Sequence, residues 1–325
     1  MAKYIIKRLL LLIPTIILVT LIVFVLMRML PGSAVDALVL RLNSTGTYTV
    51  EREDVEAQLG LDKPIAQQYL IWLWNAIHGD LGDCFFQNET VVQAIGRQIG
   101  PSLELGILTL LLTELISIPL GLFCAARQDT ISDYTIRIIS LIMMSVPMFF
   151  IATVVLIYPA IWWGYSPPAD YVSLFENPIK NMQMFLIPAI LGAITQSGMQ
   201  LRTVRTVLLD NLRSDYVRTV WAKGAKEKRV VFVHGFRNAM IPVITLIGGS
   251  VSGLIGGSVI LENLFNIPGI GQQVINAINN RDYMLVQGCI LVFSLFTMLV
   301  NLLVDISYKW IDPRVSLDNE RRSGA

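Results

Sequence analysis

The stretch that decides the fold of this chain is Leu9–Met27, which reads LLLLIPTIILVTLIVFVLM. It carries no charge over 19 residues, and at about 1.5 Å per residue a helix of that length reaches about 28 Å, close to the thickness of a hydrocarbon core. The run is longer than the apolar region of a signal peptide, roughly 7–15 residues, and no small-x-small cleavage site follows it. We therefore predict a transmembrane helix here.

Five further charge-poor stretches are each long enough to cross a membrane. The predicted helices lie near residues 103–126, 138–162, 184–201, 241–261 and 284–307. The whole chain has 54% hydrophobic and only 15% charged residues, whereas soluble domains carry roughly 25% charged residues. The sequence thus predicts an all-α integral membrane protein with six transmembrane helices.

The distribution of Lys and Arg predicts the orientation of these helices. With the N-terminus in the cytoplasm, the inner segments hold 18 basic residues and the outer segments hold 6. Basic residues concentrate on the cytoplasmic side of membrane proteins, so we expect both termini to be cytoplasmic. The expected organisation is an N-terminus with helix one (1–30), an external loop (31–100), a membrane core (95–308) and a cytoplasmic tail (309–325).

Two connections are too long to be simple turns. In the external loop, the stretch from Pro64 to Ile77 spaces its apolar residues as in an amphipathic helix. Such a helix could lie on the membrane or a partner, or it could pack on the rest of this protein; the sequence leaves both open. The second connection, residues 202–240, is cytoplasmic and basic, and long ordered loops often carry function.

The composition also excludes several classes of function. With 25 basic and 24 acidic residues the chain is almost neutral, which argues against nucleic acid as a partner. Two histidines and three widely spaced cysteines offer neither a catalytic dyad nor a metal site. No glycine-rich phosphate loop with its lysine occurs. We expect an integral membrane protein with no catalytic residue and no bound cofactor of its own.

Polar residues inside the predicted helices are candidates for a translocation pathway. Glu114 lies near the centre of the second helix, where a carboxylate is costly unless a cavity or partner reaches it. It could meet a cationic group of a substrate, or it could be a protonated or hydrogen-bonded carboxyl buried between helices. Gln196, Ser197 and Gln200 in the fourth helix could line a wet path or bond to neighbouring helices.

The cytoplasmic connection contains a short helix with recognisable ends. Ser214 is a candidate N-cap and Gly224 a candidate C′ residue, and a second helix is predicted from about Lys226 to Ala239, stopping before Pro242. Between the caps, an apolar stripe comprises Tyr216, Val217, Val220 and Trp221. An amphipathic helix of this kind could insert into a groove of a cytoplasmic partner. The alternative is a basic loop that only fixes topology and touches lipid headgroups.

The residues of this connection resemble a known motif. Asp215–Gly224 (DYVRTVWAKG), followed by 234–239 (HGFRNA) and Pro242, resembles the ATPase-coupling motif of ABC-importer permeases, in the branch that carries dipeptides, oligopeptides, nickel and glutathione. The resemblance implies coupling roles for Asp215, Tyr216, Arg218, Thr219, Ala222, Lys223, Gly224, His234, Arg237 and Asn238.

Other motifs of that family follow in order along the chain. The stretches of this chain that are similar to these motifs are 28–32 (RMLPG), 59–64 (LGLDKP), 262–271 (ENLFNIPGIG), 280–283 (NRDY) and 312–314 (DPR). The resemblance implies a type I ABC-importer transmembrane domain in the bacterial inner membrane. The implied partners are a homologous second permease, two ATP-binding subunits that bind ATP and Mg²⁺, and an extracytoplasmic substrate-binding protein. Peptides are the expected cargo, with nickel, a metal chelate or glutathione as alternatives; an ion-coupled secondary transporter is the alternative class.

Overall fold

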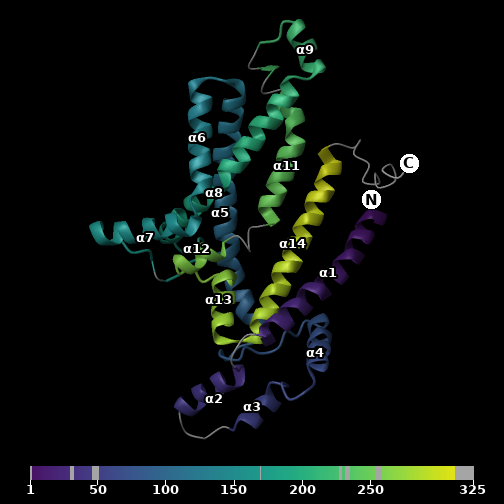
Figure 1. Ribbon diagram of the computed structural model, residues 1–325, viewed down its shortest axis with the longest axis vertical. Helices are drawn as coiled ribbons and strands as arrows, with labels where there is room; N and C mark the ends of the chain where they lie inside the picture. The colour runs from purple at the N-terminus through teal and green to yellow at the C-terminus, as the bar shows by residue number, and fades with distance from the viewer. Residues whose placement is uncertain are drawn as a thin grey trace. The chain divides into compact units, whose positions relative to one another are not determined.

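The computed structural model describes residues 2–29, 33–45, 51–168, 170–226, 229–230, 235–252 and 258–311. In these ranges the regular structure is helical, apart from one isolated bridge between Asp83 and Thr90 (Figure 1). The helices are α1 (Ala2–Met29), α2 (Ala34–Thr45), α3 (Arg52–Gln58), α4 (Ile65–Ile77), α5 (Val91–Ala126), α6 (Ile131–Ser145), α7 (Met148–Trp163), α8 (Pro178–Leu212), α9 (Asp215–Ala222), α11 (Phe236–Ser252), α12 (Val259–Leu264), α13 (Ile270–Asn280) and α14 (Tyr283–Ile311).

Six apolar segments of the described residues correspond in order to the six predicted transmembrane helices. Four helices, α1, α5, α8 and α14, are long and apolar enough to cross a membrane individually. The pair α6 and α7 meets the same test when it is taken together. The sixth segment is the shorter apolar stretch Pro242–Val251 within α11.

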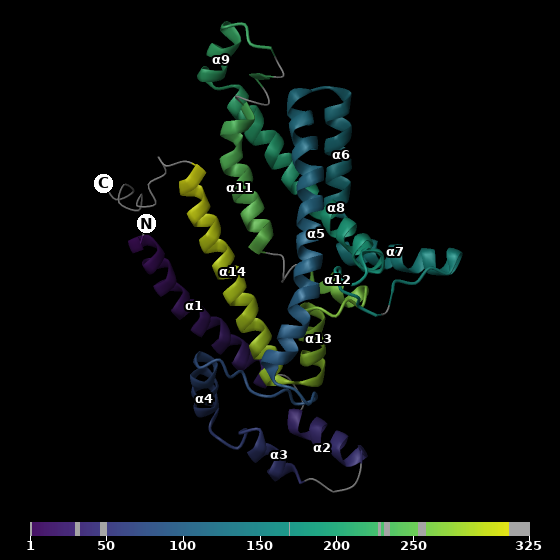
Figure 2. The ribbon, with the colours of Figure 1, turned by 180° about the vertical axis from the view of Figure 1, so that it is seen from behind.

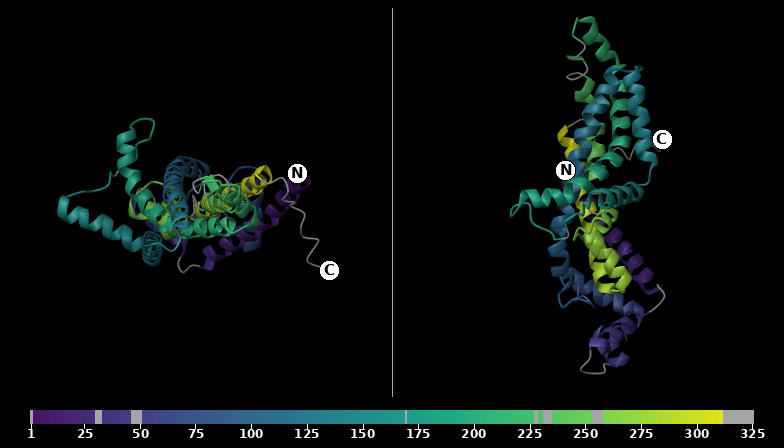
Figure 3. Two further views of the ribbon diagram at one scale, coloured as in Figure 1. Left: turned by 90° about the horizontal axis from the view of Figure 1, so that it is seen from above. Right: turned by 90° about the vertical axis from the view of Figure 1, so that its left-hand side faces the viewer.

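The predicted helix at 138–162 is wrong as one continuous helix. It is divided between α6 and α7, which meet at an angle of 88° (Figure 2, Figure 3). Pro147 causes the break, because its ring disfavours a helical conformation at Val146, whose ψ is 125°. The helix predicted at 241–261 is also interrupted, since α11 ends at Ser252 and α12 begins at Val259.

The helix predicted from Lys226 to Ala239 differs from the structure at its C-terminal end. Instead of stopping before Pro242, α11 begins at Phe236 and continues through this proline. Proline is tolerated in transmembrane helices because neighbouring groups can satisfy the backbone carbonyl that it leaves free. At the predicted start, the Lys226 carbonyl oxygen accepts from the N–H groups of Arg229 and Val230, at 2.9 and 3.1 Å, as in a helical turn; residues 227–228 and 231–234 lie outside the described residues.

Two compact units make up the chain, and the first comprises residues 1–102 and 268–298. In this unit α4 packs on α1, because the Tyr69 hydroxyl donates to the Ile17 carbonyl oxygen at 3.0 Å and Trp72 is buried beside Phe24. This packing realises the second alternative for the external helix. The apolar residues at the two ends of α4 do not take part in this packing, since Ile65 and Ile77 are exposed.

The second unit comprises residues 103–267 and 299–325, and its centre is the antiparallel pair α6 and α8. The two helices approach closely at Gly198, where an added Cβ would lie 2.9 Å from the Ser140 carbonyl oxygen. A similar approach joins α5 to α8 at Gly121, where a Cβ would lie 2.8 Å from Val204. Because neither position has room for a side chain, glycine sets the spacing of these three helices.

Candidate functional site

The first candidate site is the short helix α9, which follows α8 after two residues. Arg213 ends α8, and Ser214 occupies the N-cap position of α9 with an extended backbone, as predicted (Figure 1). Its side chain does not cap α9, however. The Ser214 hydroxyl instead donates to the Asn211 carbonyl oxygen at 2.5 Å, so it bonds to the end of the preceding helix.

Gly224 ends α9 in the way its position predicts. Its φ is +77°, a left-handed conformation that glycine adopts without a steric cost. The Gly224 N–H donates to the Trp221 carbonyl oxygen at 2.9 Å, and the Ala225 N–H to that of Val220 at 3.4 Å. These two bonds make a Schellman cap, which turns the chain sharply at the end of α9.

Most side chains of α9 are exposed. Only Val217 of the predicted apolar stripe is fully buried, whereas Tyr216 and Trp221 keep 40% and 46% of their surface exposed. The other residues predicted to couple to an ATPase, Asp215, Arg218, Thr219, Ala222, Lys223 and Gly224, are exposed as well. His234 lies outside the described residues, and Arg237 and Asn238 belong to α11. The helix therefore presents two aromatic rings and a mixed polar surface that this unit does not cover.

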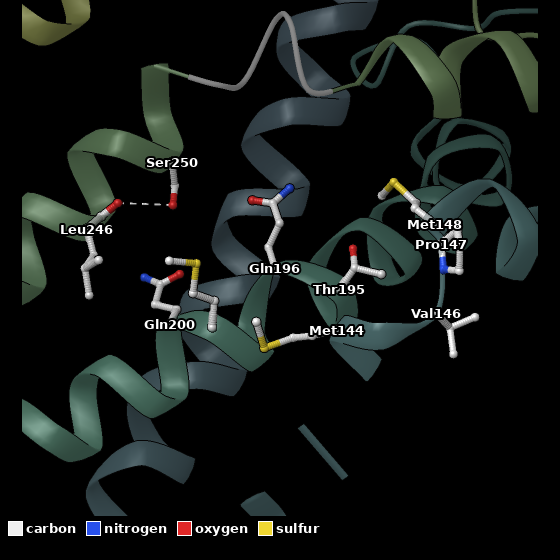
Figure 4. A pocket seen from close by; sticks show the side chains of 10 residues that line it. Met144, Val146, Pro147, Met148, Thr195, Gln196, Gln200, Leu246 and Ser250 are labelled. Atoms are coloured by element: carbon white, nitrogen blue, oxygen red, sulfur yellow. Dashed lines mark hydrogen bonds between the residues drawn. The ribbon is translucent and has the colours of Figure 1, made fainter. Parts of the chain in front are cut away.

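The second candidate site is a cavity of about 440 Å³ beside α8 (Figure 4). Its lining comes from the junction of α6 and α7, from α8 and from α11, all in the second unit. The lining residues are Met144, Val146, Pro147, Met148, Thr195, Gln196, Met199, Gln200, Leu246 and Ser250. Its size is within the range of small-molecule pockets, about 300–1,000 Å³.

Two of the four predicted pathway residues line this cavity, namely Gln196 and Gln200. Figure 4 shows the Gln196 amide lying between Ser250 and Thr195. Glu114 is not part of the lining; it lies behind Gln200, whose Nε2 donates to Glu114 Oε1 at 2.5 Å. Ser197 is buried, and its hydroxyl donates to the Ile194 carbonyl oxygen of its own helix at 3.0 Å.

Sequence reasoning missed several members of this site. Thr195 and Met199 lie on the predicted helix beside the residues that were selected, whereas Met144 and Ser250 come from distant segments. The pairing of Asp133 with Arg205 was also missed. The Arg205 guanidinium donates to both carboxylate oxygens of Asp133, at 2.9 and 2.7 Å, and thereby fixes α8 to α6 between the cavity and α9.

Comparison with known proteins places these features in a family. The model of the family described as "Binding-protein-dependent transport system inner membrane component" matches residues 117–317, and the model of its N-terminal component matches residues 1–99. A putative peptide transport system permease protein of Brucella suis is 36% identical over 318 residues, covering 98% of this chain and 100% of the relative. The dipeptide transport system permease protein DppB of Escherichia coli K12 is 33% identical, covering 97% and 99%.

Among solved structures, inward-facing MetNI, a methionine ABC transporter, matches with a TM-score of 0.51. The match covers 69% of this chain and 99% of that chain at 15% sequence identity, so it supports the fold alone. The two family models and the full-length relatives go further, because together they cover nearly every residue. The chain belongs to the family of binding-protein-dependent transport system inner membrane components, with the helical transmembrane fold of a type I ABC importer.

Proposed function

We propose that this chain is the permease subunit of an ATP-driven importer of dipeptides or oligopeptides. It forms half of the translocation pathway together with a homologous second permease. Two separate subunits bind ATP and Mg²⁺ and dock on α9, and an extracytoplasmic binding protein delivers the peptide. Both chain termini lie in the cytoplasm. The relatives support the peptide cargo, since they are named as peptide and dipeptide permeases.

The observation that carries this proposal is that only two residues connect α8 to α9. A single helix, Pro178–Leu212, lines the cavity through Thr195 to Gln200 and ends two residues before α9. The ion pair between Arg205 and Asp133 also attaches this helix to α6, whose last turn contributes Met144 to the cavity. A displacement of α9 by an ATPase would therefore move two walls of the cavity together.

Gly224 offers a test with a matched control. An added Cβ meets nothing within 4 Å, so a substitution here acts only through the backbone conformation. Valine strongly opposes a positive φ, at a cost of about 1–2 kcal/mol, whereas asparagine tolerates it. We expect Gly224→Val to uncouple the complex and Gly224→Asn to remain active. The measurements are peptide uptake and substrate-stimulated ATP hydrolysis by the complex in proteoliposomes, with equal amounts of inserted permease.

A second variant tests the docking surface itself. The pair between Arg218 and Asp215 is 3.5 Å long, and both side chains are largely exposed, so it contributes little to the stability of α9. Replacing Arg218 and Thr219 together by glutamate should therefore leave α9 folded but change its net charge from zero to strongly negative. Loss of ATPase binding is the expected result. Normal ATPase assembly and normal stimulated hydrolysis in this variant and in Gly224→Val would refute the coupling role of α9.

A further inference from the structure

The hydroxyl groups that line the cavity can only accept hydrogen bonds from a ligand. The Thr195 hydroxyl donates its proton to its own helix, at 2.9 Å from the Gly192 carbonyl oxygen and 3.2 Å from that of Leu191. In α11, the Ser250 hydroxyl likewise donates to the Leu246 carbonyl oxygen at 3.2 Å (Figure 4). A hydroxyl has one proton and two lone pairs, so both oxygens have acceptor capacity left and no donor.

Because of Glu114, the Gln200 amide likewise has only a hydrogen-bond acceptor left for a ligand. The Gln200 Nε2–H group donates to the Glu114 carboxylate oxygen at 2.5 Å. With Nε2 engaged, Gln200 Oε1 is the end of the amide that remains for a ligand. The second carboxylate oxygen, Glu114 Oε2, is buried without a hydrogen-bond partner.

The charge of Glu114 is also uncompensated in the described part of the chain. None of the ion pairs found there includes Glu114, and its described polar contact is the neutral Gln200 amide. A carboxylate at this depth is costly without a cationic partner or water. The site thus combines a negative charge with three lining residues that each keep an acceptor, namely Thr195 Oγ1, Gln200 Oε1 and Ser250 Oγ, and we call these three atoms the acceptor cluster.

We propose that this cavity is a subsite for an ammonium group, the free amino terminus of a peptide in transit. The acceptor cluster receives its N–H groups, and the Glu114 carboxylate, acting through Gln200, supplies the counter-charge. An ammonium has three donors and no acceptor, which complements the three acceptors. The inference rests on the proposed function, because it assumes that the transported peptide passes through this cavity.

The apolar part of the lining suits the rest of such a ligand. Three methionines, Met144, Met148 and Met199, contribute to the cavity wall. Methionine side chains are flexible and polarizable, and they adapt to partners of different shape. The subsite would therefore recognise the amino terminus that peptides share and accept different side chains next to it.

A chemical-modification experiment tests this subsite without relying on the binding protein. Met199→Cys, in a background without the native cysteines, places a thiol in the lining next to Gln200 and leaves the acceptor cluster intact. In the assembled complex, its reaction rates are measured with a cationic reagent, aminoethyl methanethiosulfonate, and an anionic one, sulfonatoethyl methanethiosulfonate. Each rate is divided by the rate of the same reagent with free mercaptoethanol.

We expect the cationic reagent to be preferred, and Glu114→Gln to lower this preference by about tenfold, as loss of one partly screened charge in a low-dielectric site implies. Glu114→Gln keeps the shape, but its amide can also donate to Gln200 Oε1, so the Gln200 amide is no longer held in one orientation. The matched control is Glu176→Gln, which removes an exposed carboxylate in the same unit and should change nothing. If Glu114→Gln assembles poorly, Gln200→Met is the second variant, and a preference reduced at least threefold is expected.

An unchanged preference in Glu114→Gln or Gln200→Met would overturn the subsite, as would failure of both reagents to react at position 199. Uptake of the tripeptide Ala-Ala-Ala by the reconstituted complex is measured separately. Absence of uptake with the expected labelling pattern would refute the peptide importer but keep the ammonium site. Normal uptake with no reagent preference would refute the ammonium site alone.

Discussion

The ion pair between Asp133 and Arg205 allows a quantitative prediction about what holds α6 to α8. The Asp133 side chain is 0% exposed and that of Arg205 is 14% exposed, and two hydrogen bonds of 2.9 and 2.7 Å join them. The backbone N–H of Asp129 donates a third bond to the same carboxylate, at 3.1 Å. Asp133→Ala would leave the Arg205 charge buried without a partner, and we expect a loss of about 3–5 kcal/mol in the free energy of unfolding.

Removing both charges should be less harmful than removing one. In the double variant Asp133→Leu/Arg205→Met, the attraction disappears together with the cost of removing two charged groups from water. We therefore expect the double variant to be more stable than Asp133→Ala, with a coupling energy of at least about 2 kcal/mol between the two positions. An exposed pair provides the control: Arg52→Ala breaks the contact with Glu56 and should change the stability far less than Asp133→Ala, because water screens this pair.

The assay is denaturant titration of the detergent-solubilised permease, followed by tryptophan fluorescence, for the wild type, Asp133→Ala, the single variants Asp133→Leu and Arg205→Met, the double variant and the control. The reasoning would be refuted if the losses of the single variants simply add up in the double variant. It would also be refuted if Asp133→Ala stayed within about 0.5 kcal/mol of the wild type, a difference typical of exposed positions.

Two further predictions concern topology and thiol chemistry. In a background without the native cysteines, an impermeant thiol reagent should label Asp62→Cys in intact cells and Lys226→Cys only after permeabilisation; the reverse pattern would invert the proposed orientation. Burial raises the pKa of the Cys84 thiol to about 12, so at pH 8 only about one thiol in ten thousand is ionised. N-ethylmaleimide should accordingly label Cys84 only when the protein is unfolded or the pH approaches that value, and labelling at the rate of the Asp62→Cys thiol would contradict this.

The sequence predicted the membrane segments and the end of α9 because these depend on local chemistry. A charge-free run such as Leu9–Met27 must be buried in lipid or protein whatever its neighbours are. Gly224 was likewise predicted from its position alone, since a left-handed residue is needed where a helix ends and the chain turns. The break at Pro147 was within reach of the same reasoning, because proline restricts the residue before it.

The geometry of the cavity could not be predicted, because it depends on the register between helices. Glu114 and Gln200 are 86 positions apart, and nothing in the residues around them indicates that one donates to the other. Ser250 is one of two serines in a run of small residues, and it carries no signal of its own until α11 is placed beside α8. The sequence therefore indicated polar candidates for a pathway without indicating which ones line the cavity.

Substitutions at Gly121 and Gly198 have different structural consequences from substitutions in the cavity lining. A larger side chain at either position would force apart α8 and its neighbour, since a single added carbon already approaches backbone or side-chain atoms within 3 Å. Gln196 and Met199, by contrast, are exposed in the lining of the cavity, where a change of side chain need not move a helix. With the cavity as the proposed subsite, cargo preference can therefore diverge at its lining while the scaffold is inherited unchanged.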